Sequence, residues 1–272
     1  MPDSAEIPVA LALAGSDSGG GAGIQADLKT FAAFGVFGTS AITALTAQNT
    51  LGVQGIHPVP PAFIAEQIDS ICADFPVAAV KVGMLGTSEA VKAVAEKISG
   101  HKLPHLVLDP VMAAGGGERL LEREATGALI DHLLPLAEVL TPNIDEAREL
   151  LGIDRISGIG EMKEAARLIH KLGARCVLLK GGHIRGGAAD VLFEGGDAIV
   201  LEGRWVDTPH THGTGCTLSS ALAAGLALGK PVREAAAAAK EYIQGAIENA
   251  LPLGGGRGPL NHMYRQLSEK PA

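Results

Sequence analysis

The sequence is short of residues on which several classes of protein depend. Aromatic residues make up only 3% of its 272 residues, so few side chains are available for stacking on exposed bases. The formal net charge of −8 points the same way, because nucleic acids and anionic membranes attract basic surfaces. We therefore expect no nucleic acid and no membrane as a partner, although a locally positive site can still bind phosphate.

Long apolar runs and paired cysteines are also missing. No apolar run reaches the roughly 18 residues of a transmembrane helix, and residues 1–8 contain two acidic residues but no basic one, unlike a signal peptide. The cysteines are Cys72, Cys176 and Cys216, without the spacing of a zinc site or a disulfide scaffold. These absences predict a cytoplasmic protein with reduced thiols.

Hydrophobic residues, at 47%, are numerous enough for a large core. Apolar runs typical of strands alternate with helical patterns, and several runs are continuously apolar, as in strands covered on both faces. We predict strands at residues 9–14, 39–46, 77–82, 105–109, 139–141 and 176–180, and helices at 24–34, 61–75, 87–98, 124–134, 144–151, 162–172 and 218–228.

This alternation is typical of the α/β class, with a doubly wound, mostly parallel central sheet and helices on both faces. Residues 190–194 and 198–202 flank Gly195-Gly196-Asp197 and predict a hairpin, which would form a small antiparallel edge. Because no composition break marks a linker, we expect one domain over residues 1–272.

The richest motif is His210-Thr211-His212-Gly213-Thr214-Gly215-Cys216-Thr217, between a strand-like run (198–206) and the helix at 218–228. Unpaired N–H groups and the helix dipole at such a turn favour an anion. A cysteine at the same place has its thiolate form favoured. The motif predicts an anion hole beside a proton acceptor, and the alternative is an ordinary glycine-rich turn with a buried cysteine.

Other polar or glycine-rich segments also follow predicted strands, at the edge where doubly wound sheets bind ligands. They are residues 15–23, 48–49, 83–84, 109–110, 141–143 and 180–183. Gly21-x-Gly23-x-x-Ala26 fits a dinucleotide fingerprint, but the next strand ends on Gln48 where that fingerprint needs an acid, which disfavours an oxidoreductase. The other interpretation is a loop that lets a small substrate approach, with Asp27 facing it or simply solvated. Walker A and protein-kinase motifs are absent.

Several polar residues allow both a structural and a functional interpretation. Asn143 and Glu146 have the spacing of a capping box, yet Glu146 and Asp109 could hold Mg²⁺ through water. Lys180 could bind phosphate or extend to solvent. The amide of Gln48 matches the edge of an aminopyrimidine, or ties down its own loop. Met84 could pack on a flat ring or in the core, and we assign no catalytic role to His183 or His212.

Taken in order, these motifs resemble those of the bifunctional hydroxymethylpyrimidine/phosphomethylpyrimidine kinases of thiamine biosynthesis, in the ribokinase-like superfamily. The resemblance runs from Ala12 to about His262. It rests on AGSDSGGGAGIQADLKTF (14–31), ITALTAQNT (42–50), KVGML (81–85), LDPVM (108–112), TPNxxEA (141–147), LLKGGH (178–183) and HGTGCTLSSALAA (212–224). It implies ATP-dependent phosphorylation of 4-amino-5-hydroxymethyl-2-methylpyrimidine to its monophosphate and then its diphosphate. The alternative is a vitamin B6 kinase of the same fold.

The resemblance also implies roles for individual residues. Cys216 takes the place of the base, Gly213, Thr214 and Gly215 supply the anion hole, and Lys180 binds phosphate. Gln48 binds the pyrimidine, with Asp27, Gly15, Ala22, Thr46, Met84 and Val111 around it. Asp109, Asn143 and Glu146 belong to the ATP–Mg²⁺ region. A homodimer is expected, and the intact anion hole and cysteine disfavour a non-catalytic binding protein.

Overall fold

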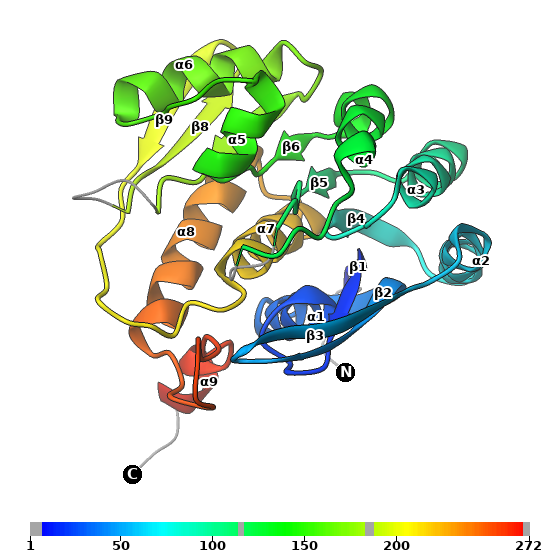
Figure 1. Cartoon of the computed structure of the whole chain (residues 1–272), viewed down its shortest axis with the longest axis horizontal. Helices are drawn as coiled ribbons and strands as arrows, with labels where there is room; N and C mark the ends of the chain where they lie inside the picture. The colour runs from blue at the N-terminus through cyan, green and yellow to red at the C-terminus, as the bar shows by residue number, and fades with distance from the viewer. Residues whose placement is uncertain (1–6, 114–116, 183–187, 269–272) are drawn as a thin grey trace, which may run out of the picture.

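The computed structural model describes residues 7–113, 117–182 and 188–268 and shows one sheet with helices on both sides (Figure 1). The sheet has nine strands in the order β3-β2-β1-β4-β5-β6-β7-β8-β9. The strands are β1 (Val9–Asp17), β2 (Phe37–Asn49), β3 (Gly52–Pro58), β4 (Val77–Val82), β5 (Leu106–Leu108), β6 (Val139–Leu140), β7 (Cys176–Leu179), β8 (Asp190–Glu194) and β9 (Asp197–Leu201).

The centre of the sheet is parallel and both of its edges are antiparallel. Strands β2, β1, β4, β5, β6 and β7 pair in parallel, whereas β3 pairs antiparallel with β2, and β8 and β9 pair antiparallel beyond β7. The β8–β9 turn uses Gly195 and Gly196, whose φ angles of 61° and 93° suit glycine in a tight hairpin. The predicted fold class and the hairpin are confirmed.

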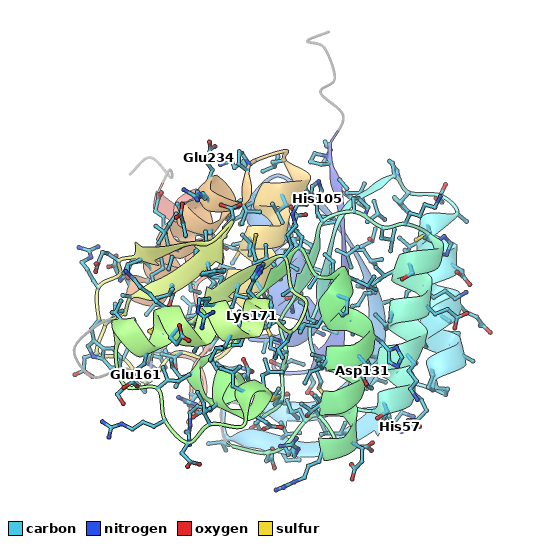
Figure 2. The ribbon with its side chains drawn as sticks, turned by 90° about the horizontal axis from the view of Figure 1, so that it is seen from above. His57, His105, Asp131, Glu161, Lys171 and Glu234 are labelled. Carbon is cyan, nitrogen blue, oxygen red and sulfur yellow. The ribbon has the colours of Figure 1, made fainter. Side chains whose placement is uncertain are left out.

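The helices form two layers. One face is covered by α1 (Gly23–Ala33), α7 (Thr214–Ala227) and α8 (Val232–Glu248), and the other by α2 (Pro61–Cys72), α3 (Ser88–Gly100), α4 (Arg123–Ala128), α5 (Ile144–Leu151) and α6 (Ile159–His170). A π-helical turn (Leu129–Leu133) and a 3₁₀ turn (Leu134–Leu136) continue α4, and α9 (Tyr264–Ser268) follows α8. Each layer packs on its own buried cluster. The labelled charged side chains, such as Glu161 and Lys171, point outward from the helices (Figure 2).

Several elements depart from the sequence prediction, including the short helix α9, which was not predicted. Strand β3 was not predicted, because its residues 54–58 are exposed and carry no apolar run. Helix α8 was not predicted either, although its buried residues recur at helical spacing. Strand β9 ends at Leu201 and α7 begins at Thr214, so the glycine turn follows an irregular segment and not a strand, and it forms the first turn of the helix itself.

The topology brings the polar segments together. Strand β1 lies between β2 and β4, so the chain winds in opposite directions from this point, where doubly wound sheets open a crevice at their carboxyl ends. The loop after β1, the end of β2 and Gly83-Met84 after β4 all lie there. Within the described residues, no helix is both long and apolar enough to span a membrane.

Candidate active site

The N-terminus of α7 is built to receive an anion. Gly213 caps the helix with φ 85°, and a Cβ atom there would collide with the carbonyl oxygen of Gly21. The N–H of Thr214 reaches the carbonyl of Thr211 at 3.4 Å. Among the described residues, no acceptor is found for the N–H groups of Gly215 and Cys216. These two donors, with the helix dipole behind them, are free for an anionic ligand.

A partly buried cation lies next to this helix terminus. The Nζ atom of Lys180 donates to Oδ1 of Asp109 at 2.8 Å, and a Cβ on Gly215 would lie 3.3 Å from the same Nζ and 3.6 Å from Oδ2 of Asp109. Burial lowers the pKa of Lys180, but Asp109 and Glu146 outweigh that effect and raise it above its ordinary value. The lysine is therefore charged, and its charge adds to the positive field at the helix terminus.

Glu146 and Asn143 form the capping box that the sequence predicted. The side-chain oxygen of Asn143 accepts from the N–H of Glu146 at 2.9 Å, and the Glu146 carboxylate accepts from the N–H of Asn143 at 2.7 Å. Burial raises the pKa of Glu146 to about 7, with Lys180 opposing and Asp109 adding to the rise. Glu146 lies 3.9 Å from Nζ of Lys180, so the cap belongs to the same polar cluster as Asp109.

Cys216 differs from the sequence expectation in its ionisation. Its partial burial raises the pKa of the thiol to about 11; Lys81 opposes this shift, while Asp27 and Asp109 add to it. The prediction of a favoured thiolate is therefore wrong for the protein without its ligands. Burial is the largest effect, and together with the two carboxylates it outweighs the stabilisation of the thiolate by the helix terminus.

Asp27 is completely buried and forms an ion pair with an equally buried Lys81. Lys81 donates to its two oxygens at 2.9 and 3.0 Å, and Ser220 of α7 donates to Oδ1 at 2.6 Å. The alternative of a solvated helix residue is therefore wrong. The carboxylate instead binds helix α7 through Ser220 and lies near Cys216. The sequence interpretation did not identify Lys81 as its partner.

The residues expected around the pyrimidine gather at the ends of β1, β2, β4 and β5. A Cβ on Gly15 would lie 3.1 Å from Sδ of Met84, so the methionine packs on this glycine. Met84 is 9% exposed, and Val111 donates its N–H to the carbonyl of Asp109 at 2.8 Å. Ala22, Thr46 and Gln48 join the network described next, and His183 lies outside the described residues.

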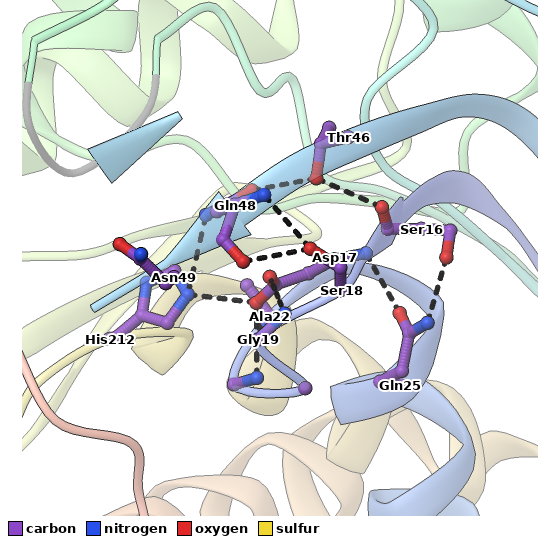
Figure 3. A network of polar contacts seen from close by, with 12 residues as sticks. Ser16, Asp17, Ser18, Gly19, Ala22, Gln25, Thr46, Gln48, Asn49 and His212 are labelled. Atoms are coloured by element: carbon purple, nitrogen blue, oxygen red, sulfur yellow. Dashed lines mark hydrogen bonds and ion pairs between the residues drawn. The ribbon is translucent and has the colours of Figure 1, made fainter. Parts of the chain in front are cut away.

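A network of polar contacts connects the β1–α1 loop, the end of β2 and the turn before α7 (Figure 3). Oδ2 of Asp17 accepts from Nε2 of His212 at 2.9 Å and from the N–H of Ala22 at 2.8 Å. Nε2 of His212 also lies 3.4 Å from Nε2 of Gln48, and Thr46 contacts Oε1 of Gln48 at 3.0 Å. Gln48 therefore contacts His212, the residue that directly precedes the Gly213 cap of α7.

The phosphomethylpyrimidine kinase family matches residues 17–261. The chain belongs to this family. It is 49% identical to a hydroxymethylpyrimidine/phosphomethylpyrimidine kinase of Haemophilus influenzae, over 93% of this chain and 95% of that protein. It is 53% identical to the thiamine biosynthesis bifunctional protein ThiED of Geobacter sulfurreducens, over 93% of this chain but only 52% of that protein.

Solved structures show the same fold in kinases for another vitamin. The crystal structure of Bacillus subtilis pyridoxal kinase with ADP superposes with a TM-score of 0.90 at 43% identity, covering 96% of this chain and 99% of that one. The family that the sequence resembles and its ribokinase-like fold are thus confirmed. Sequence reasoning did not predict the contact of Asp17 with His212 or that of Lys81 with Asp27. Each of these contacts joins two of the family's motifs.

Proposed function

We propose that the protein transfers the γ-phosphoryl group of ATP to the hydroxymethyl oxygen of 4-amino-5-hydroxymethyl-2-methylpyrimidine, and a second one to the phosphate of the product. The observation that carries this proposal is the pair of unpartnered N–H groups of Gly215 and Cys216 with the charged Lys180 beside them. Phosphoryl transfer depends mostly on positioning and charge neutralisation, which such a site supplies. Gln48, at the far side of the same crevice, presents an amide suited to an aminopyrimidine edge.

In the first transfer, the alcohol needs to lose a proton as its oxygen attacks phosphorus. Cys216 is the proton acceptor in this proposal, because its sulfur lies at the helix terminus that receives the phosphoryl group. The N–H groups of Gly215 and Cys216, together with Gly213 and Thr214 of the same turn, stabilise charge on the transferring group. Lys180 binds a phosphate oxygen as a point charge.

In the second transfer, the acceptor is already anionic, so no base is required. The site has to tolerate two negative groups, and the helix terminus and Lys180 meet that need together. In this proposal the pyrimidine binds between Gln48 and Met84, in a site lined by Gly15, Ala22, Thr46 and Val111. Asp27 holds helix α7 next to this site through Ser220. This accounts for both activities in a single crevice.

Mg²⁺ fits the site as an ion held mostly by the nucleotide. The described residues contain no cluster of three or more histidine, cysteine or acidic side chains that could hold a metal alone. Asp109 and Glu146 are hard oxygen donors next to Lys180, and Asn143 fixes Glu146, so two carboxylates could contact the hydration shell of the ion. When bound, Mg²⁺ would neutralise charge on the ATP phosphates.

Vitamin B6 phosphorylation is the second candidate function. A pyridoxine kinase of Bacillus subtilis is 43% identical over 96% of this chain and 98% of that protein, so the fold accommodates both kinds of ring. The deciding experiment incubates the protein with ATP, Mg²⁺ and each alcohol in turn and identifies products by mass spectrometry. The absence of phosphorylated pyrimidine would overturn the proposal, and a monophosphate alone would overturn its second step.

We also propose a cytoplasmic homodimer that associates through the β2–β3 edge. All three cysteines are free, in keeping with a reducing compartment. Strand β3 is an edge strand, and the exposed apolar residues Leu45, Leu51 and Ile56 lie on β2, in the turn and on β3. Such an exposed apolar edge favours association. Light scattering should give a dimer for the natural chain and a monomer for Ile56→Glu.

A further inference from the structure

The starting point is a carboxylate that settles which nitrogen of His212 carries a hydrogen. Asp17 is 3% exposed, and its Oδ2 accepts from the N–H groups of Gly21 and Ala22 as well as from Nε2 of His212. Burial raises the pKa of Asp17, but the hydrogen bonds from His212, Ala22 and Gly19 outweigh it and lower the pKa below its ordinary value. Asp17 is therefore ionised and only accepts, so Nε2 of His212 is the donor.

This assignment conflicts with the contacts of the Gln48 amide (Figure 3). Nε2 of His212 faces Nε2 of Gln48 at 3.4 Å, which places two N–H donors against each other. At the other end, Oγ1 of Thr46 lies 3.0 Å from the carbonyl of Ser16 and 3.0 Å from Oε1 of Gln48. One hydroxyl proton cannot serve two acceptors, so one of these contacts is oxygen against oxygen.

Rotating the Gln48 amide by 180° about its Cγ–Cδ bond exchanges its oxygen and nitrogen. This removes both the donor–donor contact with His212 and the oxygen–oxygen contact at Thr46. The carbonyl oxygen of Gln48 then shares, at 3.4 Å, the one hydrogen that Nε2 of His212 donates mainly to Asp17 at 2.9 Å. The amide nitrogen donates to Thr46, which still donates to Ser16. We propose that His212, held by Asp17, is a positioning residue that fixes the Gln48 amide with its oxygen toward the α7 turn and its nitrogen toward Thr46. The Asp17–His212 pair thereby determines the orientation in which an acceptor ring binds.

The consequence for the substrate rests on the proposed pyrimidine kinase function. An aminopyrimidine presents a ring nitrogen that accepts beside an amino group that donates, and the hydroxymethyl carbon is bonded next to the amino-bearing carbon. With the amide fixed, the amino group pairs with Oε1 on the His212 side and the ring nitrogen pairs with Nε2. The hydroxymethyl group then lies on the side of His212, toward the N–H groups of Gly215 and Cys216 where the phosphoryl group arrives. The opposite amide orientation would direct it away.

The test compares two substrates in variants of His212. The second substrate carries a 4-oxo group in place of the amino group, so its edge has the donor and the acceptor exchanged. His212→Leu removes the donor, and His212→Gln retains a donor that can reach the position of Nε2. We expect the preference in kcat/KM for the amino over the oxo compound to fall about tenfold or more in His212→Leu and to be largely kept in His212→Gln, with the KM for ATP unchanged. His210→Leu, two residues away in the same segment, should keep the preference of the natural chain.

The outcomes separate this proposal from the function on which it rests. If the natural chain does not phosphorylate the pyrimidine, the proposed function fails. If it does, the positioning role is contradicted by either of two results. One is that His212→Leu lowers kcat/KM for both substrates by the same factor. The other is that His210→Leu reduces the preference for the amino compound as much as His212→Leu does. Should His212→Leu fail to fold, nuclear Overhauser contacts of the Gln48 amide protons in the natural chain decide the matter. Contacts to Thr46 support the proposal, and contacts to the His212 ring overturn it.

Discussion

Raising the pH should accelerate phosphorylation of the hydroxymethyl group and leave phosphorylation of the monophosphate almost unchanged. The pKa of the Cys216 thiol is about 11, so at pH 7 only about one molecule in 10⁴ carries the thiolate. If the thiolate accepts the alcohol proton, the rate rises about tenfold per pH unit, or about 100-fold from pH 7 to pH 9. The monophosphate, with a second pKa of about 6, is already ionised throughout this range.

The assay is a single-turnover quench with each acceptor separately, so that the transfer step itself is timed. Glu146 titrates near pH 7, and its ionisation affects both acceptors, so the ratio of the two profiles isolates the contribution of Cys216. Cys216→Ser should flatten the alcohol profile, because a serine hydroxyl does not ionise in this range, while ATP binding stays nearly unchanged. Cys216→Ala should behave likewise and keep residual activity from the backbone donors.

Two results would refute this reasoning. Equal slopes for the alcohol and the monophosphate would mean that Cys216 does not act as the base for the alcohol. A slope that survives in Cys216→Ala would assign the titration to another group. In either case a role of the thiol in substrate contact would be the better interpretation.

Three further predictions follow from the same contacts. Gln48→Ala should weaken pyrimidine binding by about 1–3 kcal/mol in calorimetric titration and leave ATP binding intact; an equal loss for both ligands would indicate a folding role. Asp27→Asn leaves Lys81 buried without its counter-ion and should reduce the free energy of unfolding in urea by about 3–5 kcal/mol. The double variant Asp27→Leu, Lys81→Met should lose less of this free energy, because it buries no unpaired charge. Equal stability of Asp27→Asn and the natural chain would contradict this. The pKa of Glu146 is raised from 4.5 to about 7 in the folded state, so the native state retains a proton that the unfolded state releases, and stability should fall by about 3 kcal/mol as pH rises from 4.5 to 7. Glu146→Gln should remove that part of the slope in urea unfolding measured across this range, and an unchanged slope would show that Glu146 is not responsible.

The sequence was most informative where local chemistry decides the structure. Strand β4 and helix α5 begin and end where predicted, because a continuous apolar run forms the first and a capping box begins the second. Helix α7 begins earlier than predicted, since the glycine pattern was interpreted as a turn outside the helix. With Gly213 in the left-handed region, residues 214–217 continue as helix, and the glycine turn becomes the anion site itself.

The parts of the site that were not predicted depend on contacts between distant segments. Asp17 and His212 are 195 positions apart, and Lys81 and Asp27 are 54 apart. Neither pair has a spacing that suggests contact, so only the folded sheet brings them together. The same applies to the ionisation of Cys216, where the helix terminus is visible in the sequence but the nearby carboxylates are not.

Helix α7 explains why these distant groups keep a fixed geometry. It is buried almost all round, and its small polar residues bond to acidic side chains from both sides of the crevice. Ser219 contacts Asp109 at 3.3 Å and Ser220 donates to Asp27 at 2.6 Å, while Thr217 contacts His262 at 2.9 Å. The free N–H groups at its start are therefore held in place relative to both carboxylates before any ligand binds. Donors fixed in advance need no reorganisation as charge develops during the transfer, which is the condition under which electrostatic stabilisation is most effective.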